Sequence, residues 1–289
     1  MDHRPVLLAE SLELLAVTPG GRYVDGTLGL GGHAAEILRQ SAPDGHLLAT
    51  DRDGEMQSRA RHNLAEFSER VTFRQADFRT IPSLLGAERV DGILLDLGIS
   101  SAQLDDPDRG LSFQVEGPLD MRLDRSEGLT AEDLVNRMRE RELADVIYRF
   151  GEEHASRRIA RAIVAARPLR TTRELAEVVR RAAPRSRRPG LHPATRTFQA
   201  LRIHVNRELE GLGDAFRALA RCLRPGGRMA VIAFHSLEDR EAKQAFRALV
   251  PEGFQILTKK PVRPGEAEVR ENPRARSARL RAIERKEAA

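Results

Sequence analysis

The sequence predicts an α/β fold in which a Rossmann-like sheet of about seven strands is interrupted by an inserted helical domain. Strand-like segments alternate with helical ones up to residue 97, and the alternation returns after residue 207. Between residues 130 and 205 every periodic segment is helical. Strand–helix alternation at this spacing is typical of parallel βαβ units, and the helical interval predicts a separate module.

The predicted elements of the sheet follow one another at short intervals. An amphipathic helix is expected first, at residues 3–17, because leucines recur along one side of it. Strands are then predicted at 22–26, 46–51, 71–77, 90–97, 228–234, 254–260 and 278–285. Helices that accompany these strands in the same domain are predicted at 33–40, 54–67 and 208–223.

The inserted domain is expected at residues 105–206, and the core at 1–104 and 207–289. It begins with an acid-rich, loop-like stretch and continues with helices at 131–150, 156–167 and 172–183. In doubly wound sheets, ligands bind outside the carboxyl ends of the strands. An insertion after the strand at 90–97 leaves from that edge, so we expect this domain to recognise the substrate.

The positive charge is concentrated in the insertion. The chain has a formal net charge of +5, whereas the segment 167–196 holds nine arginines and two acids, Glu174 and Glu177. Arginine binds phosphate through a planar, bidentate fork. The segment therefore indicates either a nucleic-acid contact or a solvated helix face, and charge alone leaves both interpretations open.

Composition places the chain among globular, soluble proteins. Hydrophobic residues make up 40% of 289 residues, and no stretch approaches the roughly 18 apolar residues of a membrane helix. The amino terminus lacks the pattern of a secretory signal. The single cysteine, Cys222, fits a reducing cytoplasm and lies on an apolar helix face, where we expect it to pack. It is therefore not expected to serve as a nucleophile.

A glycine-rich loop joins the first predicted strand to the next helix. Residues 23–33 read YVDGTLGLGGH, and Gly29, Gly31 and Ala34 fit the loose dinucleotide pattern. Glycines let a ligand approach the backbone, and a helix amino terminus offers free N–H groups. Asp51 ends the next strand, where a carboxylate can accept both hydroxyls of an adenosine ribose. NAD, FAD and S-adenosylmethionine all carry that ribose.

Two acids near this loop favour S-adenosylmethionine. Asp25 lies beside the loop, where it would repel a pyrophosphate and attract an ammonium group. Asp77 and Phe78 close the third strand, where an acid and an aromatic ring can recognise adenine.

The fourth predicted strand ends on another acid, Asp96, after an apolar run. A carboxylate at such a position is costly unless it is paired or faces a ligand site. Methylation of an amine needs in-line positioning and acceptors for the N–H groups. Asp96, with Ser100 nearby, is the predicted source of these acceptors.

Seven ordered strings resemble the ribosomal small-subunit methyltransferase H family between residues 4 and 281. They are RPVLLAE, DGTLGLGGH, LLDLGISSAQLDDPDRGLSF, GPLDMRLD, HPATRTFQALRIHVNREL, FHSLEDR and ENPRARSARLR. The resemblance implies a class I methyltransferase core that transfers a methyl group from S-adenosylmethionine to N4 of a cytidine in the decoding region of 16S rRNA. It implies the small ribosomal subunit as partner, and it leaves open whether the chain forms a homodimer.

The resemblance also implies a set of site residues. The cofactor contacts fall on Gly31, Gly32, His33, Asp51, Phe78, Asp96 and Gln103. Asp96, Ser100 and His235 are the candidate catalytic residues, and Asp239 is a further candidate for lining the base site. The sequence contains no metal-binding motif such as HExxH, so no required metal is expected. The competing interpretations are an NAD-type dehydrogenase and a non-catalytic RNA-binding assembly factor.

Overall fold

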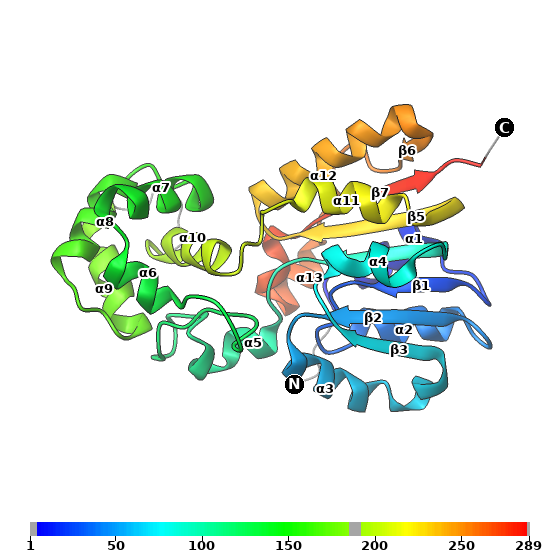
Figure 1. Cartoon of the computed structure of the whole chain (residues 1–289), viewed down its shortest axis with the longest axis horizontal. Coiled ribbons are helices and arrows are strands. Elements are labelled where there is room, and N and C mark those ends of the chain that lie inside the picture. The colour runs from blue at the N-terminus through cyan, green and yellow to red at the C-terminus, as the bar shows by residue number, and fades with distance from the viewer. Residues whose placement is uncertain (1–4, 185–191, 288–289) are drawn as a thin grey trace. The chain divides into compact units, whose positions relative to one another are not determined.

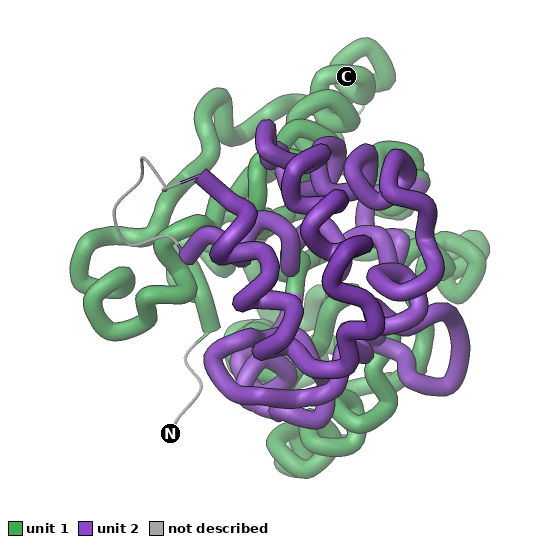
Figure 2. Tube along the Cα trace, turned by 90° about the vertical axis from the view of Figure 1, so that its left-hand side faces the viewer, with its two compact units in different colours: residues 1–98, 211–289 green, residues 99–210 purple. Residues whose placement is uncertain are grey.

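The computed structural model describes residues 5–184 and 192–287. The chain forms two compact units, residues 1–98 with 211–289 and residues 99–210 (Figures 1 and 2). The sequence places the boundaries at 104/105 and 206/207, six and four residues from those of the structure.

Unit 1 contains one seven-stranded sheet with the order β3-β2-β1-β4-β5-β7-β6. The first five strands in this order pair in parallel, whereas β7 runs antiparallel to both β5 and β6. The strands are β1 (Arg22–Asp25), β2 (His46–Asp51), β3 (Val71–Gln75), β4 (Val90–Asp96), β5 (Leu223–Ala233), β6 (Phe254–Ile256) and β7 (Arg279–Arg285). The predicted fold class and strand number are confirmed.

Helices flank this sheet, and their buried apolar side chains explain their positions. α1 and α2 share one hydrophobic core with β1 and β2, in which Leu12, Ile37 and Leu47 are buried. On the β5 side, α11 packs against α12 (Figure 1). The helices of unit 1 are α1 (Leu8–Leu15), α2 (Gly32–Gln40), α3 (Gly54–Asn63), α4 (Ile81–Leu85), α11 (Leu212–Ala220), α12 (Ser236–Leu249) and α13 (Glu266–Glu271), with 3-10 turns η1 (Ala65–Arg70), η2 (Phe78–Thr80), η4 (Val250–Glu252) and η5 (Pro273–Ser277).

Unit 2 is helical and has its own hydrophobic core, to which Leu134, Ile147, Ile159, Leu175 and Phe198 contribute. Each side chain comes from a different helix, so the amphipathic periodicity of the sequence produces one shared interior. The helices are α5 (Ser101–Asp105), α6 (Ala131–Arg137), α7 (Glu140–Gly151), α8 (Ser156–Ala165), α9 (Thr172–Ala182) and α10 (Thr195–Val205), with a 3-10 turn η3 (Pro107–Arg109).

Several predicted boundaries are wrong for local backbone reasons. The first helix begins only at Leu8, because Leu7 adopts a left-handed conformation with φ 53°. The helix predicted at 131–150 is two helices, because Met138 and Arg139 are both extended. The helix predicted at 208–223 begins at Leu212, after Gly211 with φ 62°.

Other differences concern length and omission. β5 begins at Leu223, earlier than predicted, and β6 covers only three residues. The helices α4, α12 and α13 were not predicted individually. Cys222 is buried between α11 and β5, where burial raises the pKa of its thiol, which supports the predicted packing role. Within the described residues, no helix combines the length and apolar character needed to cross a membrane.

Candidate active site

Three carboxylates end three neighbouring strands of unit 1. Asp51 ends β2, Asp25 ends β1 and Asp96 ends β4, and these strands are adjacent in the sheet. The chain leaves β1 toward β2 on one side, whereas β4 leads to β5 on the other. This reversal is the topological switch point of a doubly wound sheet, where such folds bind ligands.

The glycine-rich loop after β1 is held by Asp51. Its Oδ2 accepts a hydrogen bond from the Gly29 N–H at 2.7 Å, and its Oδ1 accepts one from the Asp53 N–H at 2.9 Å. Gly29 and Gly31 have φ values of 52° and 84°, a region that favours glycine. A Cβ on Gly29 would meet nothing closer than 4.0 Å among the described atoms. The loop is therefore fixed by the next strand and leaves space beside Gly29.

Burial changes the electrostatics of two of these acids. Asp25 is 1% exposed, and its desolvation raises the pKa of the carboxyl to about 7, although nearby His33 and a hydrogen bond from the Thr27 N–H act in the opposite direction. Burial likewise raises the pKa of Asp51. Desolvation disfavours the charged form of an acid, so a cation placed here would relieve that cost.

Asp96 lies beside two residues of the glycine-rich segment. Its backbone N–H donates to Thr27 Oγ1 at 2.5 Å, and its Oδ2 lies 3.6 Å from His33 Nε2. Its Oδ1 is buried and makes no hydrogen bond with the described residues. Thr27 was not among the predicted site residues, and its hydroxyl joins the β1 loop to the end of β4. In the sequence, Thr27 is marked as a site residue only by its place in the string DGT.

Phe78 follows β3, as the sequence indicated, and is 8% exposed. The guanidinium of Arg79 lies 4.8 Å from the centre of its ring. Asp77 forms ion pairs with Arg79 at 3.0 Å and with Arg52 at 3.4 Å. Asp77 is thus already paired with two arginines, while the ring of Phe78 is buried just after the end of β3. A Cβ on Gly26 would lie 3.1 Å from Phe78 Cβ and 2.4 Å from Leu95, which explains the glycine.

Ser100 and Gln103 belong to unit 2, where they form a capping box at the start of α5. Ser100 Oγ accepts from the Gln103 N–H at 3.2 Å, and Gln103 Oε1 accepts from the Ser100 N–H at 2.8 Å. Such a box satisfies two otherwise free donors of a short helix. Both side chains therefore have a local structural role, and their predicted catalytic and cofactor roles stay predictions.

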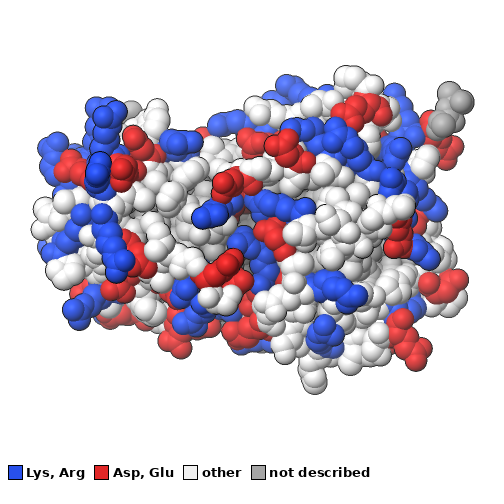
Figure 3. Space-filling model, viewed as in Figure 1, with Lys and Arg blue, Asp and Glu red and all other residues white. Residues whose placement is uncertain are grey.

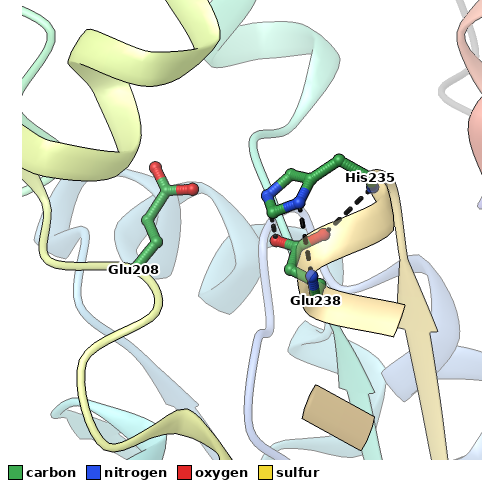
Figure 4. Close-up of side chains that lie close together, drawn as sticks. All are labelled: Glu208, His235 and Glu238. Atoms are coloured by element: carbon green, nitrogen blue, oxygen red, sulfur yellow. Dashed lines mark hydrogen bonds and ion pairs between the residues drawn. The ribbon is translucent and has the colours of Figure 1, made fainter. Parts of the chain in front are cut away.

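His235 precedes α12 of unit 1 and caps the amino end of this helix together with Glu238 (Figure 4). His235 Nδ1 accepts from the Glu238 N–H at 3.3 Å, and Glu238 Oε2 accepts from the Phe234 N–H at 2.9 Å. Glu208, also drawn in Figure 4, belongs to unit 2 and pairs there with Arg202 at 2.9 Å. The capping geometry gives His235 a structural role, and its catalytic role stays a prediction.

Asp239 is held by two arginines of β7. It pairs with Arg281 at 2.6 Å and with Arg279 at 3.5 Å. These contacts join α12 to the sheet, so Asp239 has an architectural role in addition to its predicted place near the base site.

The basic segment of unit 2 has less uncompensated positive charge than its sequence suggests, because several of its arginines pair with acids. Arg180 and Arg181 both pair with Glu177 at 2.7 Å. Arg173 pairs with Glu116 at 3.5 Å and Arg196 with Glu153 at 3.8 Å. On the face drawn in Figure 3, basic and acidic side chains are interspersed.

The acids and the loop suit S-adenosylmethionine. The cofactor combines a ribose, an adenine, a sulfonium and an amino acid group. Asp51 lies where a ribose would meet a carboxylate, Asp25 is a buried acid near the loop, and no side chain among the described residues caps the amino end of α2. The residues present therefore fit a cofactor that is cationic at one end and carries an adenosine at the other.

The strand order, the antiparallel β7 and the acid-ended strands around a glycine-rich loop define a Rossmann-like class I methyltransferase core. The chain belongs to the MraW methylase family, whose model matches residues 1–286.

Curated relatives agree over the full length. One from Acidobacterium capsulatum, named "Ribosomal RNA small subunit methyltransferase H", is 50% identical over 98% of this chain and 98% of its own. Another with the same name, from a Cyanothece species, is 51% identical over 99% of this chain and 95% of its own. A solved structure titled putative rRNA-methylase, from Clostridium thermocellum, aligns with a TM-score of 0.48 at 11% identity, over 98% of this chain and 99% of its own. The family model and the curated relatives show that the chain is a methyltransferase, and these relatives are named for ribosomal RNA of the small subunit.

Proposed function

We propose that this methyltransferase transfers a methyl group from S-adenosylmethionine to the N4 amino group of a cytidine in the decoding region of 16S rRNA. The observation that carries the proposal is Asp96, which ends β4 at the switch point with a buried Oδ1 that has no hydrogen-bond partner among the described residues. The names of the curated relatives support the rRNA substrate, and the small ribosomal subunit in the cytoplasm is the proposed partner.

The cofactor would be held mainly by residues of the glycine-rich segment. Asp51 would accept both ribose hydroxyls, and Phe78 would pack against adenine. The amides of Gly31, Gly32 and His33 at the start of α2 would bind the carboxylate, because a helix amino terminus favours an anion. Gln103 of unit 2 is proposed as a further contact, on the family resemblance alone.

The same electrostatics argue against a dinucleotide. A pyrophosphate at this loop would meet Asp25 and Asp96 at the ends of two adjacent strands. Repulsion between like charges within a few ångströms is unfavourable, particularly where water is excluded. Isothermal titration with S-adenosylmethionine and with NAD distinguishes the two, and we expect binding of S-adenosylmethionine only.

Asp96 would act on the acceptor amine. The bound cofactor supplies an electrophilic methyl group on a sulfonium, so the protein needs to orient the amine and accept its proton. The amino lone pair of cytosine is delocalised into the ring. An acceptor on an N–H favours pyramidalisation and compensates the positive charge that develops in the transition state. A carboxylate oxygen at the end of β4 provides such an acceptor.

Methylation of ribosomal RNA tests the proposal directly. Nucleosides of 16S rRNA from cells with and without this protein are analysed by mass spectrometry, and purified small subunits from the deficient cells are incubated with protein and cofactor. We expect loss and recovery of N4-methylcytidine. A protein that binds the subunit but restores no methyl group would instead be a non-catalytic assembly factor.

Asp51→Ala is expected to weaken the binding of S-adenosylmethionine by roughly 10- to 100-fold. Two ribose hydroxyls would lose a charged acceptor, which contributes about 1.5–3 kcal/mol. Asp44→Ala is the matched control, because Asp44 is exposed and precedes the amino end of β2. Calorimetry on both variants measures the dissociation constants. Equal affinity of Asp51→Ala and wild type would remove Asp51 from the cofactor site.

The RNA contact is assigned to the basic segment of unit 2. Arg185, Arg187 and Arg188 lie outside the described residues, so this assignment stays a prediction from the sequence. Each neutralised phosphate contributes a slope of about −0.7 to −0.9 in log affinity against log salt. Changing all three to Ser should weaken RNA binding and flatten that slope by up to roughly two units, without changing cofactor affinity. If the variant and wild type have the same RNA affinity and the same salt slope, the RNA contact lies elsewhere.

A further inference from the structure

Two side chains of unit 1 that meet at the switch point carry polar atoms without hydrogen bonds. His33 lies at the start of α2 and is 6% exposed, and its Nε2 lies 3.6 Å from Asp96 Oδ2 at the end of β4. Among the described residues, the two ring nitrogens of His33 have no hydrogen-bond partner. Oδ1 of Asp96 has none either. A buried polar atom without a partner costs about 1–3 kcal/mol. Such atoms call for an explanation, and a catalytic role is one of the explanations known for buried polar groups.

The charges around His33 oppose one another. The amino end of a helix carries a partial positive charge, which disfavours a cationic imidazole there. A carboxylate attracts a cation, and Asp96 Oδ2 lies 3.6 Å from His33 Nε2. An imidazole is the side chain best suited to take up a proton and release it again near neutral pH.

We propose that His33 and Asp96 form a proton-relay pair for the methyl transfer. The inference rests on the proposed function, because it concerns the proton that the acceptor amine must lose. Asp96 is the catalytic residue in this scheme, since it touches the amine. His33 is a positioning residue that acts through Asp96.

The proton balance follows from the reaction. The amine lone pair forms the new N–C bond, the electrons of the broken C–S bond stay on sulfur, and the amine nitrogen becomes positively charged. Asp96 takes one N–H proton, and the N–H electron pair returns to nitrogen. Asp96 then passes the proton to His33 Nε2, which leaves a carboxylate ready for the next acceptor amine. The imidazolium loses its proton to solvent after the products leave.

The distance of 3.6 Å is consistent with this role in the free protein. Catalytic hydrogen bonds are often long before ligands bind and tighten in the reactive complex. The cofactor contact proposed for His33 uses its backbone N–H, so its imidazole remains free to meet Asp96.

His33→Gln tests the relay. The glutamine amide can still donate to Asp96 from the position of Nε2, but it cannot take up a proton. We expect kcat at saturating cofactor to fall by about 100-fold. We also expect a shift in the pH range over which kcat increases. The dissociation constant of S-adenosylmethionine, measured by calorimetry without RNA, should stay within about threefold. His46→Gln is the matched control, because His46 is exposed at the amino end of β2.

A double variant adds a second criterion. If the pair acts as a unit, His33→Gln combined with Asp96→Asn should be no slower than Asp96→Asn alone. Additive losses would overturn the relay, and so would an unchanged pH profile. A change confined to cofactor affinity would make His33 a cofactor contact only. His33→Asn is measured in parallel, with thermal unfolding of each variant, so that a folding defect is recognised. Failure of wild type to methylate small subunits would instead refute the proposed function.

Discussion

Asp96→Ala is expected to reduce turnover by roughly 100- to 1,000-fold while the protein remains folded. Removing one preorganised group that stabilises developing charge has effects of this size. The fold should tolerate the change, because the side chain is 24% exposed and Oδ1 has no hydrogen-bond partner among the described residues. The backbone N–H that donates to Thr27 Oγ1 is unaffected by the substitution. Single-turnover methyl transfer to small subunits, at saturating S-adenosylmethionine, measures the loss.

Two further variants make this result specific. Asp96→Asn preserves the shape of the side chain but cannot accept a proton, so we expect it to be nearly as slow. Glu88→Ala removes an exposed carboxylate before the amino end of β4 that pairs with Arg22, and it should retain full activity. An active Asp96→Ala protein would refute the acceptor role. An unfolded one would show that Asp96 is needed for the structure of the strand end.

Asp25→Asn is expected to stabilise the cofactor-free protein at alkaline pH. The pKa of the Asp25 carboxyl is raised to about 7 in the folded state by burial, whereas an unfolded aspartate titrates near pH 4. Between these values the folded state binds the extra proton, so the stability contributed by this group falls as pH rises from about 4 to about 7. Above pH 7 the full cost of burying the charge is present, up to about 4 kcal/mol.

The neutral amide removes that cost. Urea unfolding without cofactor should give Asp25→Asn a larger free energy of unfolding than wild type at pH 8, by up to about 4 kcal/mol. Near pH 4.5 the two proteins should differ little, because the Asp25 carboxyl is then neutral in the folded state. The difference should grow steadily between these pH values. A difference that is independent of pH would show that burial does not hold this carboxyl in its neutral form.

The sequence was a good guide to the fold wherever periodicity is strong. The parallel strands and the helical module follow from apolar patterns that local burial enforces, and the seven-stranded sheet is as predicted. Boundaries failed at single residues whose backbone the pattern does not encode. Leu7, with φ 53°, delays the first helix, and the extended pair Met138–Arg139 divides the helix predicted at 131–150.

The sequence by itself determined which acids end which strands. Asp25, Asp51 and Asp96 each follow an apolar run, and parallel strands bring such ends to one edge. Motif resemblance added the family, which the comparisons confirm over residues 1–286.

Only the tertiary structure decided which of these groups are paired and which are not. It buries Asp25 and places His33 beside Asp96, contacts between residues far apart in the sequence. It brings acids such as Glu116 and Glu153 to arginines of the basic segment. That segment therefore has less uncompensated positive charge than its composition implies. The physical reason is that desolvation and ion pairing depend on neighbours in space, whereas hydrophobic periodicity depends on neighbours in the chain.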